Sequence, residues 1–187
     1  MKHFNPQLKV AYKDDHSPIT IADMESSRYI EQALGALTPD ITVISEESDA
    51  KPEQLRRFWL VDPLDGTRAY VEGVPEFSVN IGLIENGRSI FGVLHVPAQH
   101  ISYMGGVDMP AVKIHADDTL SNIRTRPPGD QWVVTKSASH PSKKLGEFLK
   151  PYPIGTFIPM SGAAKFGLIA EAAADMYPRL GPTMEWD

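Results

Sequence analysis

Apolar residues recur at helical spacing early in the chain, between Thr20 and Leu37. This spacing predicts one amphipathic helix, because residues three and four positions apart lie on the same helix face. Thr20 and Asp23, three residues apart where the pattern begins, resemble a capping box. The expected apolar face consists of Ile21, Met24, Ile30, Ala33, Leu34 and Leu37.

After this helix the pattern changes to short apolar or alternating runs separated by turn residues, which is typical of strands. Asn86-Gly87 between two such runs predicts a β-hairpin. Another turn is expected at Gly105-Gly106. Trp59, Phe77 and Tyr103 are assigned to the core. The expected strands are residues 41–44, 59–61, 77–84, 89–96, 101–104, 131–135, 154–158 and 175–180; helices are expected at 141–149 and 163–174, with a short helix or loop at 68–75.

The mixed order of helices and strands fits a layered α/β or α+β fold. A polar segment, residues 117–130, contains Pro127-Pro128-Gly129 and is the best candidate for a boundary. We therefore expect an N-terminal α+β subdomain over residues 1–116 and a partial C-terminal α/β subdomain over residues 131–187.

Composition narrows the class of protein. The 187 residues are 42% hydrophobic and 22% charged, as in ordinary globular proteins. The absence of cysteine excludes disulfides, zinc–thiolate sites and cysteine nucleophiles. No apolar run approaches the roughly 20 residues that span a bilayer, and the N-terminus lacks a signal-peptide core, so a cytoplasmic enzyme is expected. The net charge of −6 argues against nucleic-acid binding, because the overall field would repel phosphates.

Candidate chemistry begins in residues 59–67, which read W-L-V-D-P-L-D-G-T. A predicted strand ends in Asp62, and Asp65 follows after a proline. Because the proline biases Asp62 towards an extended backbone and Gly66 allows a tight path, both carboxylates and the Leu64 carbonyl are expected to point into one small volume. Oxygen ligands at that density suit Mg²⁺. The alternative is an ordinary surface turn, since D-P and D-G are common turn dipeptides.

A second predicted strand, residues 41–44, also leads to carboxylates. Glu46 and Glu47 follow it within S-E-E-S. Two adjacent glutamates on a loop are equally typical of a solvated surface. Asp23 is a further candidate acid, and capping of the predicted helix is its alternative role, because an acid in the first turn complements the helix dipole.

Four motifs in order resemble the inositol monophosphatase superfamily of Mg²⁺-dependent phosphatases: S-P-I-T-I-A-D (17–23), S-E-E-S (45–48), W-L-V-D-P-L-D-G-T (59–67) and the closing W-D. Three later segments, at 137–140, 161–166 and 177–187, resemble the bacterial 3′(2′),5′-bisphosphate nucleotidases of the CysQ type. The resemblance implies a layered αβαβα sugar-phosphatase-like sandwich. It also implies hydrolysis of the 3′-phosphate of adenosine 3′,5′-bisphosphate, giving AMP and phosphate.

The resemblance further implies two or three Mg²⁺ ions as cofactors. Two unit charges ~4 Å apart repel by about 4 kcal/mol at an effective dielectric near 20, and divalent cations remove that conflict. In the family a threonine and an aspartate orient or deprotonate the attacking water; these are Thr67 and Asp23 here, with Glu47 as a further candidate. Capping of the following helix is a rival role for Thr67. The implied metal ligands are Glu46, Asp62, the Leu64 carbonyl, Asp65 and Asp187.

The expected substrate is a small phosphate monoester, a nucleotide bisphosphate. Lys165 and Arg179 are expected to hold the phosphate that is not cleaved, and His140 to contact base or ribose. The alternatives are that Lys165 and Arg179 are surface charges and that His140 is solvated. The remaining expected contacts are Gly66, Thr67, Ser137, Ser161, Gly162 and Tyr177, with Gly162 offering N–H groups at a helix start.

The chain departs from the family pattern at both ends. Family members carry a long helix before the first motif and further elements after W-D, so we expect this chain to lack both. Two alternatives stay open: a phosphatase for inositol phosphates or fructose 1,6-bisphosphate, and a catalytically silent truncated fragment. The resemblance also implies inhibition by Li⁺ and a role in sulfur metabolism, and it leaves open a homodimer and a peripheral association with the inner membrane.

Overall fold

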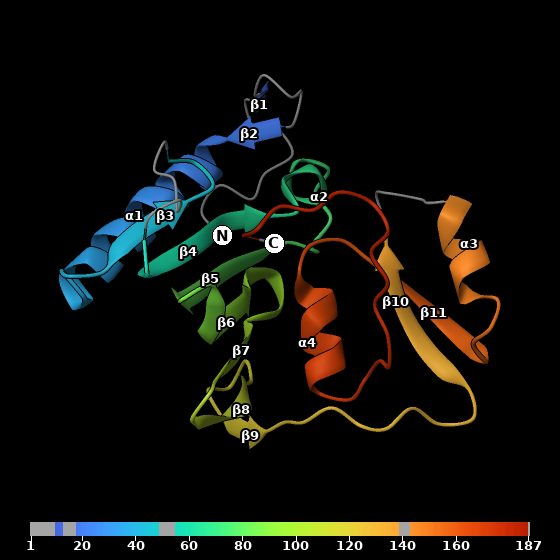
Figure 1. Ribbon diagram of the computed structural model, residues 1–187. Helices are drawn as coiled ribbons and strands as arrows, with labels where there is room; N and C mark the ends of the chain where they lie inside the picture. The colour runs from blue at the N-terminus through green and yellow to red at the C-terminus, as the bar shows by residue number, and fades with distance from the viewer. Residues whose placement is uncertain (1–9, 13–17, 49–54, 139–142, 187) are drawn as a thin grey trace.

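The computed structural model describes residues 10–12, 18–48, 55–138 and 143–186. Its largest element is a seven-stranded sheet with the strand order β3-β4-β5-β6-β7-β8-β9 (Figure 1). β3 and β4 run parallel, and each later pair of neighbours is antiparallel. The strands span Thr42–Ser45 (β3), Arg57–Asp65 (β4), Ser78–Glu85 (β5), Arg88–Val96 (β6), Ile101–Gly106 (β7), Met109–Ile114 (β8) and Leu120–Asn122 (β9).

Two further sheets have two strands each. β1 (Val10–Tyr12) and β2 (Pro18–Thr20) pair antiparallel, whereas β10 (Trp132–Ser137) and β11 (Ile154–Met160) pair parallel. In Figure 1, α4 lies between the large sheet and the β10–β11 pair, and α1 covers the opposite side of the large sheet. These layers confirm the predicted α/β class. The helices are α1 (Ile21–Leu37), α2 (Thr67–Val71), α3 (Lys143–Leu149), α4 (Ala164–Ala170) and the 3₁₀ helix η1 (Pro97–Gln99).

The predicted helix between Thr20 and Leu37 is confirmed as α1, but its buried face differs from the predicted one. Ile30 and Leu34 pack on the sheet against Trp59, Val61 and Leu83. Ile21, Met24 and Leu37, expected on that face, are exposed. The first turns instead bury Asp23 and Ser27, because both side chains have hydrogen-bond partners. The polar residues, not only the apolar ones, therefore set the orientation of this helix.

The predicted hairpin is confirmed. β5 and β6 pair through the turn at Asn86-Gly87, and both turn residues have positive φ, 50° and 73°. Two residues with positive φ are what the favoured two-residue hairpin turn requires. Trp59, Phe77 and Tyr103 are buried, as predicted.

The turn predicted at Gly105-Gly106 is wrong, because both glycines belong to β7 and pair with β6. A Cβ at Gly106 would lie only 2.9 Å from the Ile90 carbonyl oxygen, so this glycine allows close packing between strands. β8 follows and was not predicted. β9 lies inside the segment expected to be a loop, where Leu120 pairs with Ile114 of β8. The subdomain division at residues 117–130 stays a prediction.

The strand predicted at residues 175–180 is also wrong. Only Met176 forms an isolated bridge, with Val134 of β10. Pro178 has no N–H to continue such a ladder. The preceding helix, predicted to reach residue 174, ends at Ala170 in α4, and Ala172 has a φ of 63°, outside the helical region. None of the helices in the described ranges combines the length and apolar character needed to cross a membrane.

Candidate active site

The acids of the first motifs lie where the parallel pairing of β3 with β4 ends. Ser45 of β3 pairs with Val61 of β4, and the Glu46 N–H donates to the Val61 carbonyl at 2.9 Å. Glu46 and Asp62, the next residue on each chain segment, therefore lie side by side in the backbone. The Asp62 side chain is 1% exposed, and its Oδ1 accepts the Leu64 N–H at 3.0 Å. The carboxyl ends of neighbouring parallel strands are a common place for ligand sites.

The expected turn after Asp62 is instead an irregularity within β4. The strand continues to Asp65, and its register against β5 shifts between Asp62 and Asp65. Gly66 follows with a φ of 89°, a conformation that favours glycine. A Cβ there would lie 3.0 Å from the Glu76 carbonyl oxygen. We call residues 62–67 the acid corner.

Asp23 reaches the acid corner from the start of α1 and has two roles. Its Oδ2 accepts the Thr20 N–H at 2.7 Å, which completes the predicted capping box. Its Oδ1 accepts the Thr67 hydroxyl at 3.1 Å, and that hydroxyl lies equally close to the Leu64 carbonyl oxygen. The capping alternative for Asp23 is confirmed, and it coexists with the contact to Thr67. The predicted cap role for Thr67 is wrong, because the N-cap of α2 is Gly66 and no side chain caps this helix.

Asp23 also influences a buried tyrosine. Burial raises the pKa of Tyr70, and the negative charge of Asp23 raises it further. The Tyr70 ring packs edge-on against Phe77, with 4.9 Å between ring centroids. Tyr70 therefore stays protonated at neutral pH and forms part of the apolar wall behind the acid corner.

The second half of the candidate site lies at the ends of the β10–β11 pair. Ser137, the last residue of β10, pairs with Met160, the last residue of β11, and Ser161 follows directly after it. The Ser161 N–H donates to Glu76 Oε2 at 2.8 Å, and the Ala163 N–H donates to the Ser78 hydroxyl at 3.1 Å. These contacts bring residues 161–163, which we call the serine turn, against the acid corner. Two of the N–H groups near Gly162 that were expected to face an anion therefore already have partners.

The two cations expected to bind phosphate contact their own backbone. Lys165 is 5% exposed and donates to the carbonyls of Met160, at 3.2 Å, and Gly162. Its Nζ lies 5.1 Å from the Tyr177 ring centroid. Arg179 is exposed, and its Nη2 donates to the Pro182 carbonyl at 2.7 Å. The surface-charge alternative is wrong for Lys165, which is buried, and Arg179 does lie on the surface.

His140 and Asp187 lie outside the described residues. Glu47 follows Glu46 in the turn after β3, and its N–H donates to the Ser45 hydroxyl at 3.4 Å. Its carboxylate role stays a prediction.

The donor set of the acid corner fits Mg²⁺ by its chemistry, since it offers carboxylate and carbonyl oxygens. Asn80 adds an amide that the sequence did not single out. It pairs with Asp62 across β4 and β5, and neither atom of its buried amide has a hydrogen-bond partner in the described structure. A buried amide without a protein partner beside Asp62 offers one more oxygen and N–H groups to a ligand at this place. Among the described residues, no three Asp, Glu or His side chains lie close enough together to hold a metal ion.

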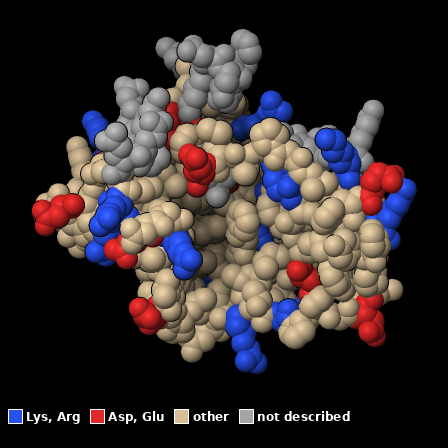
Figure 2. Space-filling model, viewed as in Figure 1, with Lys and Arg blue, Asp and Glu red and all other residues tan. Residues whose placement is uncertain are grey.

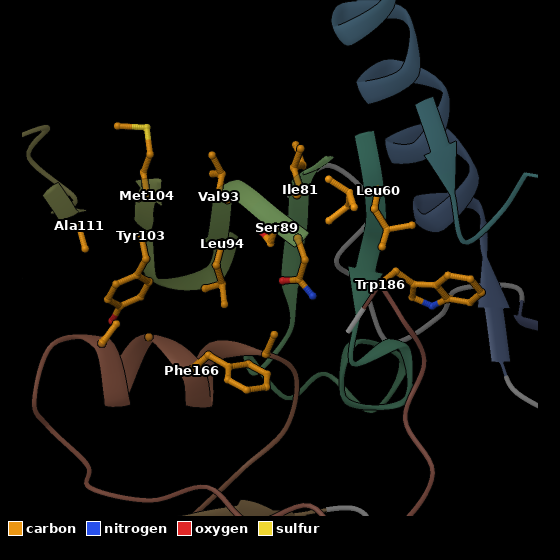
Figure 3. A pocket seen from close by; sticks show the side chains of 18 of the residues that line it. Leu60, Ile81, Ser89, Val93, Leu94, Tyr103, Met104, Ala111, Phe166 and Trp186 are labelled. Carbon is orange, nitrogen blue, oxygen red and sulfur yellow. The ribbon is translucent and has the colours of Figure 1, made fainter. Parts of the chain in front are cut away.

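A cavity of about 440 Å³ lies next to the acid corner, on the sheet face opposite α1. In Figure 3, Leu94 and Tyr103 point from the strands towards α4, and Trp186 lies at the end of the cavity nearest β4. The view in Figure 2 shows a hollow near the centre of the molecule, surrounded mainly by residues other than Lys, Arg, Asp and Glu. Because this cavity is mainly apolar and a phosphate is charged, the acid corner beside it is the better candidate site.

The comparison with known families agrees with the motifs. A model described as the inositol monophosphatase family matches residues 1–187. The chain belongs to the inositol monophosphatase family. Among individual relatives, the 3′(2′),5′-bisphosphate nucleotidase CysQ of Salmonella typhimurium is 37% identical over 184 residues, which cover 96% of this chain and 73% of that protein. The protein of the same name from Buchnera aphidicola is 36% identical over 194 residues, covering 100% of this chain and 72% of its own.

Solved structures of this inositol monophosphatase family share the fold. CysQ from Bacteroides thetaiotaomicron is 27% identical and superposes with a TM-score of 0.78, covering 99% of this chain and 73% of that one. An IMPase from Thermotoga maritima has a TM-score of 0.79 at 22% identity, covering 94% of this chain and 68% of that one. The predicted family, including its similarity to CysQ proteins, is confirmed.

Proposed function

We propose that this protein is a Mg²⁺-dependent phosphatase that hydrolyses the 3′-phosphate of adenosine 3′,5′-bisphosphate to AMP and phosphate. The observation that carries the proposal is the buried corner in which Asp23, Thr67 and the Leu64 carbonyl meet beside Asp62. The CysQ relatives, which are named as 3′(2′),5′-bisphosphate nucleotidases, select the substrate. The matches extend over 96% and 100% of this chain, so they include the described part of the candidate site and support the proposal.

The carboxylates of the acid corner would hold Mg²⁺. Asp62 and Asp65 flank the Leu64 carbonyl on β4, and Glu46 lies across the parallel pair. Asp187 is the further acid expected from the family pattern. Bound Mg²⁺ would offset the charge of these acids, polarise the phosphate and stabilise the leaving oxygen. The Leu64 N–H already holds Asp62 Oδ1 at 3.0 Å, which fixes this carboxylate before any ligand arrives.

Asp23 and Thr67 would activate the attacking water. The Thr67 hydroxyl donates to Asp23 Oδ1, which leaves its oxygen lone pairs able to accept a hydrogen from a water molecule. The water oxygen forms a bond to phosphorus, the bond from phosphorus to the 3′ oxygen breaks, and that oxygen takes up a proton from solvent. Asp23 receives one proton of the attacking water by way of Thr67 and releases it to solvent after the reaction. Glu47 stays a further candidate for this role.

The serine turn and the cations near it would hold the substrate. Ser137 and Ser161 would donate to phosphate, together with Gly66 and Gly162 of the two facing turns. Lys165, Tyr177 and Arg179 would hold the phosphate that is not cleaved, and His140 the base or ribose. Arg179 can grip a phosphate through two N–H groups, whereas Lys165 acts as a point charge.

The test is phosphate release by the purified protein with Mg²⁺ and with a chelator. The substrates are adenosine 3′,5′-bisphosphate, inositol 1-phosphate and fructose 1,6-bisphosphate. We expect Mg²⁺-dependent release that is fastest from the adenosine bisphosphate. Faster release from either sugar phosphate would overturn the substrate, and Mg²⁺ binding without release from any of them would favour the silent fragment.

The family resemblance also implies inhibition by Li⁺. It leaves open a homodimer and a peripheral association with the inner membrane, and a cytoplasmic location is the expectation from the sequence. Phosphate release that is unchanged in millimolar Li⁺ would contradict inhibition by Li⁺. Sedimentation of the purified protein would show whether it is a homodimer.

A further inference from the structure

The acid corner and the serine turn meet backbone to backbone. Gly66 and Gly162 both have positive φ, 89° and 62°, and neither has a side chain to separate them. A Cβ built on Gly66 would lie 3.4 Å from the Gly162 nitrogen, and one built on Gly162 would lie 3.3 Å from the Asp65 carbonyl oxygen. The chain therefore brings two segments almost a hundred residues apart into direct contact at this point.

Ser78 links the two segments by its hydroxyl. The side chain has no exposed surface. Its oxygen accepts the Ala163 N–H at 3.1 Å, and its O–H faces Asp65 Oδ2 at 3.5 Å. A hydroxyl can donate one hydrogen and accept others, so Ser78 can serve both sides at once.

Glu76 makes the second link. Its Oε2 accepts the Ser161 N–H at 2.8 Å, a charge-assisted hydrogen bond. On the same turn, the Gly162 carbonyl accepts from the Lys165 ammonium. A carboxylate and a cation therefore bind different backbone groups of the serine turn, Glu76 the Ser161 N–H and Lys165 the Gly162 carbonyl.

We propose that Glu76 and Ser78 are positioning residues that hold the serine turn at a fixed distance from the acid corner. The proposal rests on the proposed function, because that distance matters only if the acid corner activates water and the serine turn holds phosphate. Glu76, just before β5, and Ser78, its first residue, therefore connect the chain that follows the acid corner to the turn that would bind the substrate. Loss of either contact lets the turn move away from the corner and weakens substrate binding.

The test combines hydrogen exchange with kinetics. The variants are Glu76→Ala, Ser78→Ala and Glu76→Gln, which keeps an acceptor oxygen for the Ser161 N–H. We expect the Ser161 amide proton to exchange at least about tenfold faster in Glu76→Ala, and the Ala163 amide proton in Ser78→Ala. KM for adenosine 3′,5′-bisphosphate should rise about tenfold in both, with a smaller change in kcat. Glu76→Gln should stay close to the parent protein.

The matched control is Ser89→Ala, which removes an exposed serine hydroxyl at the hairpin end of β6, where Ser89 lines the cavity and pairs with Ile84, away from the Asn80 that pairs with Asp62. It should change neither exchange nor KM. Unchanged exchange and KM in Glu76→Ala and Ser78→Ala would overturn the positioning role, as would a Glu76→Gln variant as impaired as Glu76→Ala. A parent protein that releases no phosphate would overturn the proposed function instead, and the exchange rates would still report whether the two contacts hold the turn.

Discussion

The two sides of the candidate site differ in how their charged groups are used. At the acid corner, Asp23 and Asp62 are buried and accept hydrogen bonds from neighbouring N–H and O–H groups. At the substrate side, Lys165 and Arg179 donate to carbonyls of their own segment. The acid corner is thus held in place by its own hydrogen bonds, whereas the cations must exchange or share backbone partners to bind a phosphate. Changes at the corner should reduce catalysis, and changes at the cations should weaken binding.

The largest effect is expected from Asp62→Asn. The substitution keeps the shape of the side chain and an oxygen for the Leu64 N–H, but removes the charge that would hold Mg²⁺. Turnover of adenosine 3′,5′-bisphosphate should fall on the order of 1000-fold, while circular dichroism stays unchanged. Asp40→Asn, an exposed acid beyond the end of α1, is the matched control. A rate within twofold of the parent would show that Asp62 has no part in the reaction.

Thr67→Val should lower kcat by about 100-fold with little change in KM. The valine keeps the volume of the side chain but cannot donate to Asp23 or accept a hydrogen from water. Thr67→Ser should retain most of the rate because it keeps the hydroxyl. Thr42→Val on the exposed surface of β3 is the control for loss of a threonine hydroxyl. Equal losses of kcat in the serine and valine variants would contradict the role of the hydroxyl.

Arg179→Met tests the substrate side of the candidate site. Its KM for adenosine 3′,5′-bisphosphate should rise about tenfold, equivalent to about 1.4 kcal/mol, while kcat stays nearly constant. KM for adenosine 3′-monophosphate should not change, because that substrate lacks the second phosphate. Arg88→Met, at the hairpin between β5 and β6, also removes an exposed guanidinium and serves as the control. The same rise in KM for both substrates would mean that Arg179 does not hold the second phosphate.

Much of the architecture could be predicted from local pattern. The hairpin at Asn86-Gly87 and the helix after Thr20 depend on residues close in sequence, and both were found. The sequence did not reveal Glu76, Ser78 or Asn80 as parts of the site. Glu76 and Ser78 each contact residues 85 positions away, and Asn80 meets Asp62 only across a strand pair, so no local motif marks them.

The wrong predictions of backbone structure have the same origin, since they too concern contacts between segments that no local motif marks. Gly105-Gly106 was expected to be a turn because glycine pairs usually mark one. In the fold these residues pair with β6, and the absence of a side chain allows the strands to approach. The acids could be predicted as candidates from W-L-V-D-P-L-D-G-T. The irregular end of β4 could not, since it depends on the register with β5.

The smallest effect, on stability and not on turnover, is expected from the ion pair between Arg126 and Asp175. The Asp175 side chain has no exposed surface and accepts from Arg126 and from the Val133 N–H. The hydrogen bond from Arg126 lowers the pKa of Asp175, and so does the one from Val133. A carboxyl whose pKa is lower in the folded state stabilises the fold at pH values above its unfolded-state pKa of about 3.9. This stabilisation is lost as the pH falls through the folded-state pKa.

Arg126→Met should therefore lower the melting temperature slightly at neutral pH, with the difference shrinking in acid below pH about 3.9. Arg124→Met, two residues away and also exposed, should show no such pH dependence. A difference that persists unchanged at low pH would mean that Arg126 stabilises the chain by packing and not through Asp175. Neither variant should alter turnover.

The most direct test of the account is a calorimetric titration of Mg²⁺ into the purified protein and into Asp62→Asn. We expect saturable Mg²⁺ binding to the parent protein, and no binding or a large reduction in affinity in the variant. Equal Mg²⁺ affinity in both proteins would show that the acid corner does not hold the metal, and would contradict the proposed mechanism at its first step.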